Sequence, residues 1–170
     1  IDGMGPRIID VLLEEGLVGA FDDIFTLKRG DLLSLPRFAE KSVDNLLESI
    51  EKGRRTTLAR FLTSLSIPNV GEETAIDIAN EFKTIEKVSV ANAADFMQVY
   101  GVGDVVAESL ADFFRDTKNL ALVERLLKQM TLEKIETKDI SKLPLLGKSF
   151  VITGTLTSMS RDDAEAKIRA

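Results

Sequence analysis

The chain has 170 residues, of which 44% are hydrophobic and 29% charged, so it can bury one substantial core and has room for a smaller second piece. Because it contains neither cysteine nor histidine, disulfides, thiolate metal ligands and a structural zinc are excluded within it. The 22 basic and 28 acidic residues give a net charge of −6, which argues against attraction to DNA by the overall field. No apolar run approaches the roughly 18 residues of a membrane span and there is no signal peptide, so we expect a cytoplasmic protein without a membrane partner.

The first predicted element is a tight hairpin built around Gly3 and Gly5, which opens a helix over residues 8–15. Pro6 suits the first helical position, where no N–H partner is lost, and Gly16 is expected to end the helix. Since no helix precedes this hairpin, we expect the chain to be cut from a longer protein.

The same hairpin-to-helix unit is written four times. Aligned on its last residue, the hairpin ends at positions 5, 39, 71 and 103, which are 34, 32 and 32 residues apart. Each copy is followed by one apolar stripe of a helix, with a single lapse at Gly16. The stripes are Ile9, Leu12, Leu13, Gly16; Val43, Leu46, Leu47, Ile50; Ala75, Ile78, Ala79, Phe82; and Ala107, Leu110, Ala111, Phe114. The repeat predicts a compact all-α body.

The second unit departs from the glycine pattern. Arg37 and Ala39 stand where the first unit has glycines; Ala39 can begin a helix, but Arg37 cannot easily adopt a positive φ. We expect this hairpin to be distorted or reduced to packing, with Arg37 able to reach a phosphate through its side chain. Residues 17–29 are expected to hold a short helix, and the second repeat helix should span 40–51.

The densest basic cluster, Lys52-Gly53-Arg54-Arg55, follows that helix. Two interpretations are equally open. The cations either complement the negative end of the helix dipole or clamp a sugar-phosphate backbone.

Further helices are predicted over residues 58–65, 91–99 and 120–130. Asn69 replaces the first glycine of the third unit, which is tolerable because Asn readily adopts the left-handed conformation. Tyr100 in the fourth hairpin could stack on a base or sugar, but the more frequent expectation for a Tyr beside a turn is half-burial.

Each hairpin can serve as an anion site. Glycine admits a close backbone approach, the apolar residue between the glycines can turn inward as a plug, and the first N–H groups of the helix point outward at the positive end of its dipole. Gly-x-Gly before a helix is also common turn punctuation, but a mere turn does not need the same plug four times. Because residues 1–130 carry 15 basic and 22 acidic groups, net −7, binding to phosphates must rely on local dipoles and a few placed cations.

The pattern changes after residue 130. Residues 131–144 are polar with alternating charge and predict a linker. Residues 149–153 are strand-like, and a capped helix begins at Ser160. One strand and part of a helix cannot bury enough surface alone, so residues 145–170 should be the truncated start of an α/β domain.

Several stretches together have the order and spacing of one family: Ile1-Asp2-Gly3-Met4-Gly5, Leu58-Ala59-Arg60-Phe61-Leu62, Ile67-Pro68-Asn69-Val70-Gly71-Glu72, Gly101-Val102-Gly103, Leu146-Gly147-Lys148-Ser149-Phe150-Val151-Ile152-Thr153-Gly154-Thr155-Leu156 and Met159-Ser160-Arg161. Over essentially the whole chain they resemble the bacterial NAD-dependent DNA ligases. The resemblance implies four helix-hairpin-helix repeats in residues 1–130, a linker, and the start of a BRCT domain.

The resemblance also implies a role. The parent enzyme would seal nicks in DNA replication and repair by passing AMP from NAD to a lysine and then to the 5′-phosphate. That lysine lies in a Lys-x-Asp-Gly motif, which this chain lacks, so the segment should be inactive alone and hold no cofactor. NAD, magnesium and a structural zinc would belong to the rest of the parent. The implied partners are nicked double-stranded DNA and the remaining ligase domains, in the bacterial cytoplasm at the nucleoid.

In this family the hairpins grip the DNA backbone across the minor groove without reading sequence. The positions carried over by motif are Gly3, Gly5, Gly71, Gly101 and Gly103, with Arg7, Lys41, Arg54 and Arg55 as cations. Arg37 and Ala39 depart from the glycine pattern, which leaves contact by the second hairpin open. Two alternatives stay open as well: a helical scaffold that binds another protein, and a helix-hairpin-helix subunit of a repair nuclease, against which the BRCT-like junction counts.

Overall fold

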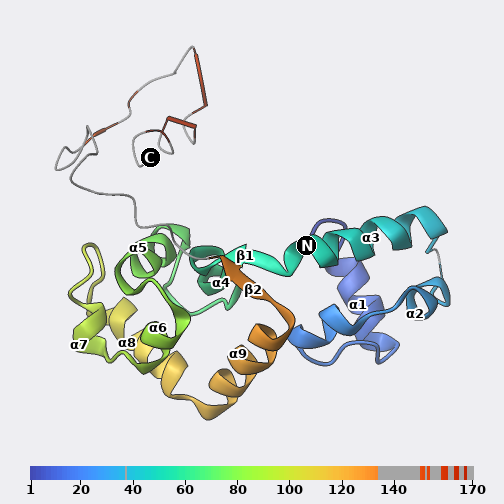
Figure 1. Ribbon diagram of the computed structural model, residues 1–170, viewed down its shortest axis with the longest axis horizontal. Coiled ribbons are helices and arrows are strands. Elements are labelled where there is room, and N and C mark those ends of the chain that lie inside the picture. Colours follow the sequence, from blue (N-terminus) through green and yellow to red (C-terminus); the bar gives the residue numbers. More distant parts are fainter. Residues whose placement is uncertain are drawn as a thin grey trace. The chain divides into compact units, whose positions relative to one another are not determined.

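The computed structural model describes residues 1–36, 38–133, 150–151, 153, 158–160, 163–164 and 167. The chain divides into two compact units, residues 1–135 and 136–170. The elements of the first unit are α1 (Pro6–Glu14), η1 (Phe21–Thr26), α2 (Arg29–Leu33), α3 (Glu40–Gly53), β1 (Arg55–Thr57), α4 (Leu58–Ser64), α5 (Glu72–Phe82), α6 (Ile85–Val90), α7 (Ala93–Phe96), α8 (Asp104–Arg115), α9 (Thr117–Gln129) and β2 (Thr131–Glu133). Within this unit, α1, α2 and α3 gather at one end and α5 to α8 at the other, with the strands and α9 between them (Figure 1).

The expected all-α fold is confirmed. Four helices, α1, α3, α5 and α8, begin one residue after the aligned positions 5, 39, 71 and 103. None of the helices in the described residues is long and apolar enough to cross a membrane. The expected BRCT start lies mostly outside the described residues and stays a prediction.

Gly16 ends α1, as the sequence predicted. Its φ of +66° is in the left-handed region, which suits a residue without Cβ. The Gly16 N–H donates to the carbonyl of Leu13 at 3.1 Å, and the Leu17 N–H donates to the carbonyl of Leu12 at 2.9 Å. This pair of bonds is a Schellman motif, and it satisfies carbonyls that the helix end would otherwise leave open.

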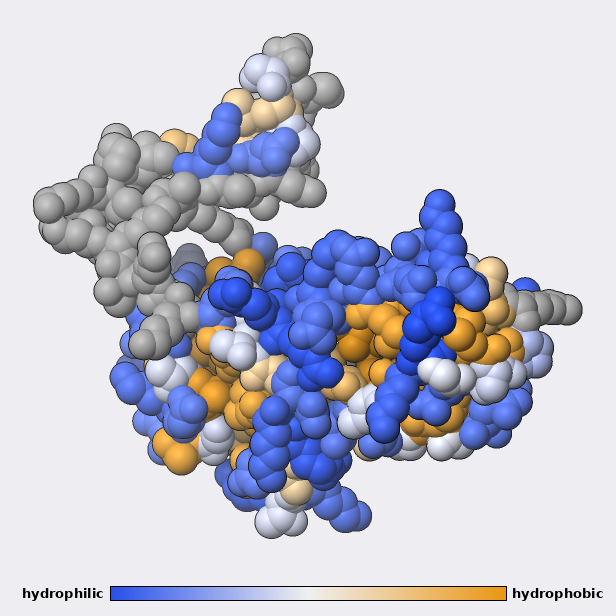
Figure 2. All heavy atoms as spheres, turned by 45° about the vertical axis from the view of Figure 1, so that its right-hand side comes forward, coloured by the Kyte–Doolittle hydropathy of each residue, from blue (hydrophilic) through white to orange (hydrophobic). Residues whose placement is uncertain are grey.

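The predicted apolar stripes of α3, α5 and α8 are buried, apart from Leu47 and Phe82, which are half-buried against the same hydrophobic core. In α1 the prediction was partly wrong: Leu12 is fully buried, but Ile9 and Leu13 are exposed. The helix has apolar residues at five of its nine positions, which is more of its circumference than its neighbours cover. Apolar side chains accordingly reach the surface between hydrophilic ones at the end of the unit that carries α1 and α3 (Figure 2).

The helix predicted over residues 91–99 is wrong in extent, and α6 was not expected. The break between α6 and α7 comes from a cap at Asn92. Its Oδ1 accepts hydrogen bonds from the N–H groups of Ala94 at 2.8 Å and Asp95 at 3.2 Å, while Asp95 accepts one from the Asn92 N–H at 2.9 Å. This reciprocal box starts a new helix there and interrupts the apolar period.

Residues 131–133, expected to begin a linker, instead form strand β2. It pairs in parallel with β1, with Arg55 opposite Thr131 and Thr57 opposite Glu133. The Thr131 N–H donates to the carbonyl of Arg54 at 2.6 Å, and Leu132 packs half-buried against the core. A three-residue strand is too short to show alternation in sequence, so only the pairing reveals it.

Candidate nucleic-acid interface

Each of the four hairpins contains the same turn hydrogen bond. In each, the N–H of the apolar plug donates to the carbonyl three residues earlier: Met4 to Ile1 and Phe38 to Leu35 at 3.4 Å, Val70 to Ile67 and Val102 to Val99 at 3.1 Å. The third turn residue has positive φ at Gly3 (+80°), Asn69 (+64°) and Gly101 (+81°). This is the requirement of a type II turn, and Pro36 and Pro68 occupy the position where that turn favours proline. The prediction for Asn69 is confirmed, whereas Arg37 lies outside the described residues.

The apolar plugs also behave as predicted. Val102 is buried, and Met4, Phe38 and Val70 are half-buried against the core. Asn69 adds a second tie, because its Nδ2 donates to Ser109 Oγ on α8 at 3.0 Å. The turns are therefore held from inside, while their tips face outward.

The helices that follow the hairpins begin without a side-chain cap. Their N-cap residues are Gly5, Ala39, Gly71 and Gly103, none of which has a side chain that can accept a hydrogen bond. By contrast, α4, α6, α7 and α9 are capped by the side chains of Thr57, Thr84, Asn92 and Asp116. The hairpin helices thus leave first-turn N–H groups, at the positive end of the dipole, for an acceptor from outside.

Three of these glycines are not required by the fold. Gly5, Gly71 and Gly103 have extended backbones, with φ of −74°, −88° and −92°, which any residue adopts. A Cβ added at each would meet nothing within 4 Å. Ala39 holds the equivalent place with φ of −86°, which shows that the turn accommodates a Cβ. An N-cap position has only a small preference for glycine over alanine. The main effect of the missing side chain is therefore to leave room for an external partner.

The second residue of each hairpin helix differs in charge along the chain. It is Arg7 in α1, Lys41 in α3, Glu73 in α5 and Val105 in α8. Arg7 and Lys41 are exposed and form no ion pair with any residue in the described ranges. Of the four helices, only α1 has no acidic residue in its first turn. The first hairpin therefore has the electrostatics best suited to a phosphate.

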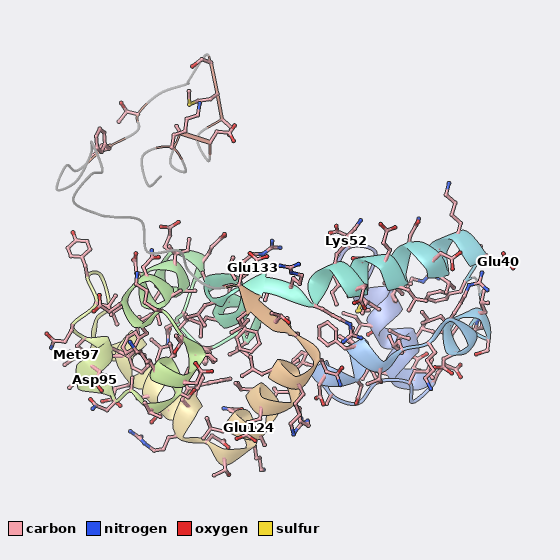
Figure 3. All side chains as sticks on the ribbon, viewed as in Figure 1. Glu40, Lys52, Asp95, Met97, Glu124 and Glu133 are labelled. Atoms are coloured by element: carbon pink, nitrogen blue, oxygen red, sulfur yellow. The ribbon has the colours of Figure 1, made fainter. Side chains whose placement is uncertain are left out.

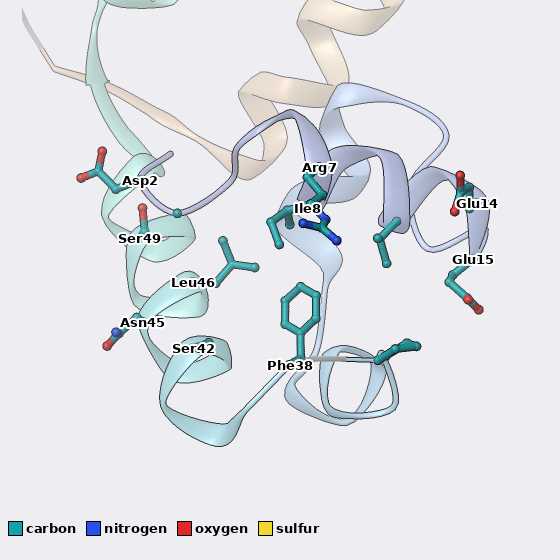
Figure 4. A pocket seen from close by; sticks show the side chains of 13 residues that line it. Asp2, Arg7, Ile8, Glu14, Glu15, Phe38, Ser42, Asn45, Leu46 and Ser49 are labelled. Carbon is teal, nitrogen blue, oxygen red and sulfur yellow. The ribbon is translucent and has the colours of Figure 1, made fainter.

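A cleft of about 830 Å³ joins the first two hairpins. It is lined by Gly3 and Arg7 from the first and by Pro36 and Phe38 from the second. Arg7 and Phe38 face each other from opposite walls (Figure 4). A cation in a groove between two hairpin tips can form an ion pair with a phosphate of a nucleic-acid backbone that crosses both tips.

Arg54 does not fit the predicted role. Its Nη1 donates to the carbonyl and the Oε1 of Gln129, at 3.0 and 3.2 Å, and its Nη2 donates to the carbonyl of Phe25 at 2.6 Å. Its Nε pairs with Glu51 at 2.7 Å, and its guanidinium lies 5.3 Å from the centre of the Phe25 ring. With its donors engaged inside the protein, Arg54 is removed from the expected DNA contacts.

The basic residues near Arg54 differ in how free their side chains are to contact a nucleic acid. Arg55, Lys52 and Arg60 line a second cleft of about 620 Å³. Arg55 and Arg60 are exposed and have no ion-pair partner among the described residues, whereas Lys52 Nζ lies 2.8 Å from Glu48, and that hydrogen bond raises the pKa of Lys52. The sequence analysis missed Arg60, although its place five residues after the basic cluster was a usable signal. Together these residues add a local cationic surface to an acidic chain.

Tyr100 differs from the more frequent expectation of half-burial. Its side chain is 95% exposed at the tip of the fourth hairpin. Gly3, Gly5, Gly71, Gly101 and Gly103 are exposed as well, so the tips are open. Among the described residues, no group of three or more acidic side chains could hold a metal ion, and the expected absence of a cofactor stays a prediction.

Comparison with known proteins places this geometry in a family. Residues 1–52 match the model of a SAM-like helix-hairpin-helix tandem, and residues 60–123 match that of a helix-hairpin-helix motif. The whole chain is 40% identical, over 171 aligned positions, to proteins named DNA ligase from Shewanella frigidimarina (strain NCIMB 400) and Alkalilimnicola ehrlichii (strain ATCC BAA-1101 / DSM 17681 / MLHE-1). The chain is a helix-hairpin-helix segment of the DNA ligase family. It spans about a quarter of the length of these ligases, 26% and 25% respectively.

The two matches also divide the first unit. One helix-hairpin-helix module, residues 1–52, holds the first and second hairpins, and the other, residues 60–123, holds the third and fourth. Arg54 lies in the short connection between the two modules of this ligase-family segment, outside both matched ranges.

Proposed function

We propose that this chain is the duplex-DNA grip of an NAD-dependent ligase that seals nicks in bacterial DNA replication and repair. The backbone N–H groups at the hairpin tips hold phosphates along the minor groove, and Arg7, Lys41 and Arg55 add cations beside them. Such contacts position the protein without reading bases. The remaining ligase domains, which would hold NAD, magnesium and a structural zinc, supply the chemistry, and the setting is the cytoplasm around the nucleoid.

One observation carries the proposal. Gly5, Gly71 and Gly103 begin helices where neither backbone angle nor packing demands glycine, and where the helix lacks a cap. An anion that approaches the first-turn N–H groups needs this empty space. A scaffold whose hairpins only hold helices together would gain stability from a capping side chain there.

Replacement of glycine by serine separates these functions. In Gly71→Ser and Gly103→Ser the new hydroxyl can cap the helix, so the melting temperature should stay equal or rise. The same hydroxyl occupies the phosphate position, so affinity for a labelled nicked duplex should fall roughly tenfold, the scale of one lost charge-assisted hydrogen bond.

Thr84→Ala is the matched control. It removes a real cap from α6, outside the hairpins, and should lower stability by about 1 kcal/mol with no change in DNA affinity. Unaltered binding by both serine variants would refute the amide grip and leave the scaffold function. The repair-nuclease alternative is not favoured, because the relatives found are ligases.

A further inference from the structure

The fourth hairpin has an apolar tip. Tyr100 is 95% exposed, Val105 is 67% exposed and Met97 is 44% exposed, all within nine residues around one turn. Three exposed apolar side chains on one hairpin, unlike single ones scattered over the surface, are typical of a contact surface. We call Met97, Tyr100 and Val105 the apolar tip.

Two members of the apolar tip, Tyr100 and Val105, occupy positions that are polar or proline in the other hairpins. Where Tyr100 stands, the first three hairpins have Asp2, Pro36 and Pro68. Where Val105 stands, they have Arg7, Lys41 and Glu73. The backbone is the same, with the turn hydrogen bond from Val102 to Val99 and an uncapped start at Gly103. The fourth hairpin thus keeps the backbone geometry of the other hairpins but presents apolar side chains to its partner.

The charge around the apolar tip disfavours a phosphate as the partner of its side chains, although the first-turn N–H groups after Gly103 can still hold one. Asp104 is the first residue of α8, and Asp95 lies beside Met97 on α7 (Figure 3). Carboxylates at a helix start compete with an anion for the dipole. The group that meets Tyr100 and Val105 is therefore uncharged.

The apolar tip is also too small for a protein partner by itself. A stable protein interface buries about 800 Å² on each side, whereas one large aromatic side chain buries roughly 150–250 Å². Three side chains suit a narrow apolar target. In duplex DNA that target is the C–H surface of the deoxyribose rings that wall the minor groove, between the phosphates that other hairpins hold.

We propose that the apolar tip packs against deoxyribose in the minor groove, so that the two modules grip DNA differently: the first by phosphate contacts, the second in part by sugar contacts. This inference rests on the proposed function, because it presumes that the hairpin tips face DNA. It implies that Tyr100 and Val105 contribute to DNA affinity by an amount that does not depend on the salt concentration.

Salt dependence distinguishes the two kinds of contact. Tyr100→Ser and Val105→Ser should each weaken binding of a nicked duplex by roughly three- to tenfold, with the slope of log affinity against log salt unchanged. Arg7→Ala should reduce the magnitude of that slope by about 0.9. Val90→Ser is the matched control for Val105, since Val90 is 83% exposed at the end of α6, away from any hairpin tip, and should leave affinity unchanged.

A fluorescent reporter tests the contact directly. The chain has no tryptophan, so Tyr100→Trp introduces a single indole that can be excited where DNA does not absorb. Its emission should change on addition of nicked duplex, while that of the control Val90→Trp should not.

The outcomes are separable. If the unaltered chain fails to bind duplex even at low salt, both the proposed function and this inference are refuted. If it binds but Tyr100→Ser and Val105→Ser bind equally well, or the indole emission does not respond, the apolar tip does not touch DNA and the proposed function stands. A reduced salt slope in either serine variant would also overturn the sugar contact.

Discussion

Arg54 and Arg55 are adjacent in one basic cluster, yet their side chains have different environments. The Arg54 side chain is 28% exposed and joins η1, α3 and the end of α9 through its hydrogen bonds. Arg55 is the first residue of β1, and its side chain is exposed at the edge of a cleft. Arg54 therefore follows neither interpretation of the cluster, because its side chain ties three elements together, while a backbone clamp stays a prediction for Arg55.

This difference predicts that replacing Arg54 affects stability, whereas replacing Arg55 affects DNA binding. Arg54→Ala should lower the free energy of unfolding by about 2 kcal/mol or more, because it leaves acceptors on Phe25 and Gln129 without their charged donor. Arg55→Ala should leave the melting temperature within about a degree while reducing the magnitude of the salt slope of DNA binding by about 0.9. Thermal melts and salt-dependent titrations measure both, and equal stability of the two variants would contradict the structural role of Arg54.

At the scale of elements, the start and end of each helix determine how the repeat is built. Hairpin helices start at residues without an acceptor side chain, whereas α4, α6, α7 and α9 start at Thr or Asx caps. Helix α1 closes with the Schellman motif at Gly16. The protein thus satisfies its ordinary helix ends internally and leaves the hairpin ends open.

Two glycine replacements test this use of helix ends. Gly16→Ala forces a side chain into positive φ and should destabilise the fold by about 1 kcal/mol. Gly30→Ala is the matched change inside helix α2, where a Cβ meets nothing within 4 Å, and should stabilise by about 0.5–1 kcal/mol. Chemical denaturation gives both values; a shift of the same sign in both variants would contradict the assignment.

At the scale of the molecule, the two helix-hairpin-helix modules are joined by more than the chain between them. Strand β2, after the second module, pairs with β1, which precedes it, and Arg54 reaches from α3 to both η1 and α9. Any partner that touches both modules therefore meets a pre-arranged surface, which lowers the entropy lost on binding.

The strand pairing predicts where this unit ends. A chain of residues 1–130 lacks β2 and should unfold about 1–2 kcal/mol more easily than residues 1–135, because it loses the Thr131 hydrogen bond and the half-buried Leu132. Denaturation of the two truncated chains compares them directly. Equal stability would mean that residues from 131 onward act as a linker.

Much of the candidate interface could be predicted because it is local. Gly3, Gly101 and Asn69 show where the backbone adopts positive φ, and the plugs at Met4, Val70 and Val102 follow from their place between the turn residues. The exposure of Tyr100 could not be predicted, because a tyrosine beside a turn packs or projects according to neighbours that are distant in sequence.

The amino-acid sequence by itself determined the four hairpins, the helices they open and the all-α class, since each depends on residues within about a dozen positions of one another. It also determined the ligase resemblance, which depends on the order and spacing of such short motifs along the chain. Only the tertiary structure decided that Arg54 is occupied while Arg55 is not, that residues 131–133 form a strand, and that α1 leaves Ile9 and Leu13 exposed. The first two outcomes depend on pairings across 29 to 76 residues, such as Arg54 with Phe25 and Arg55 with Thr131, which no local pattern encodes.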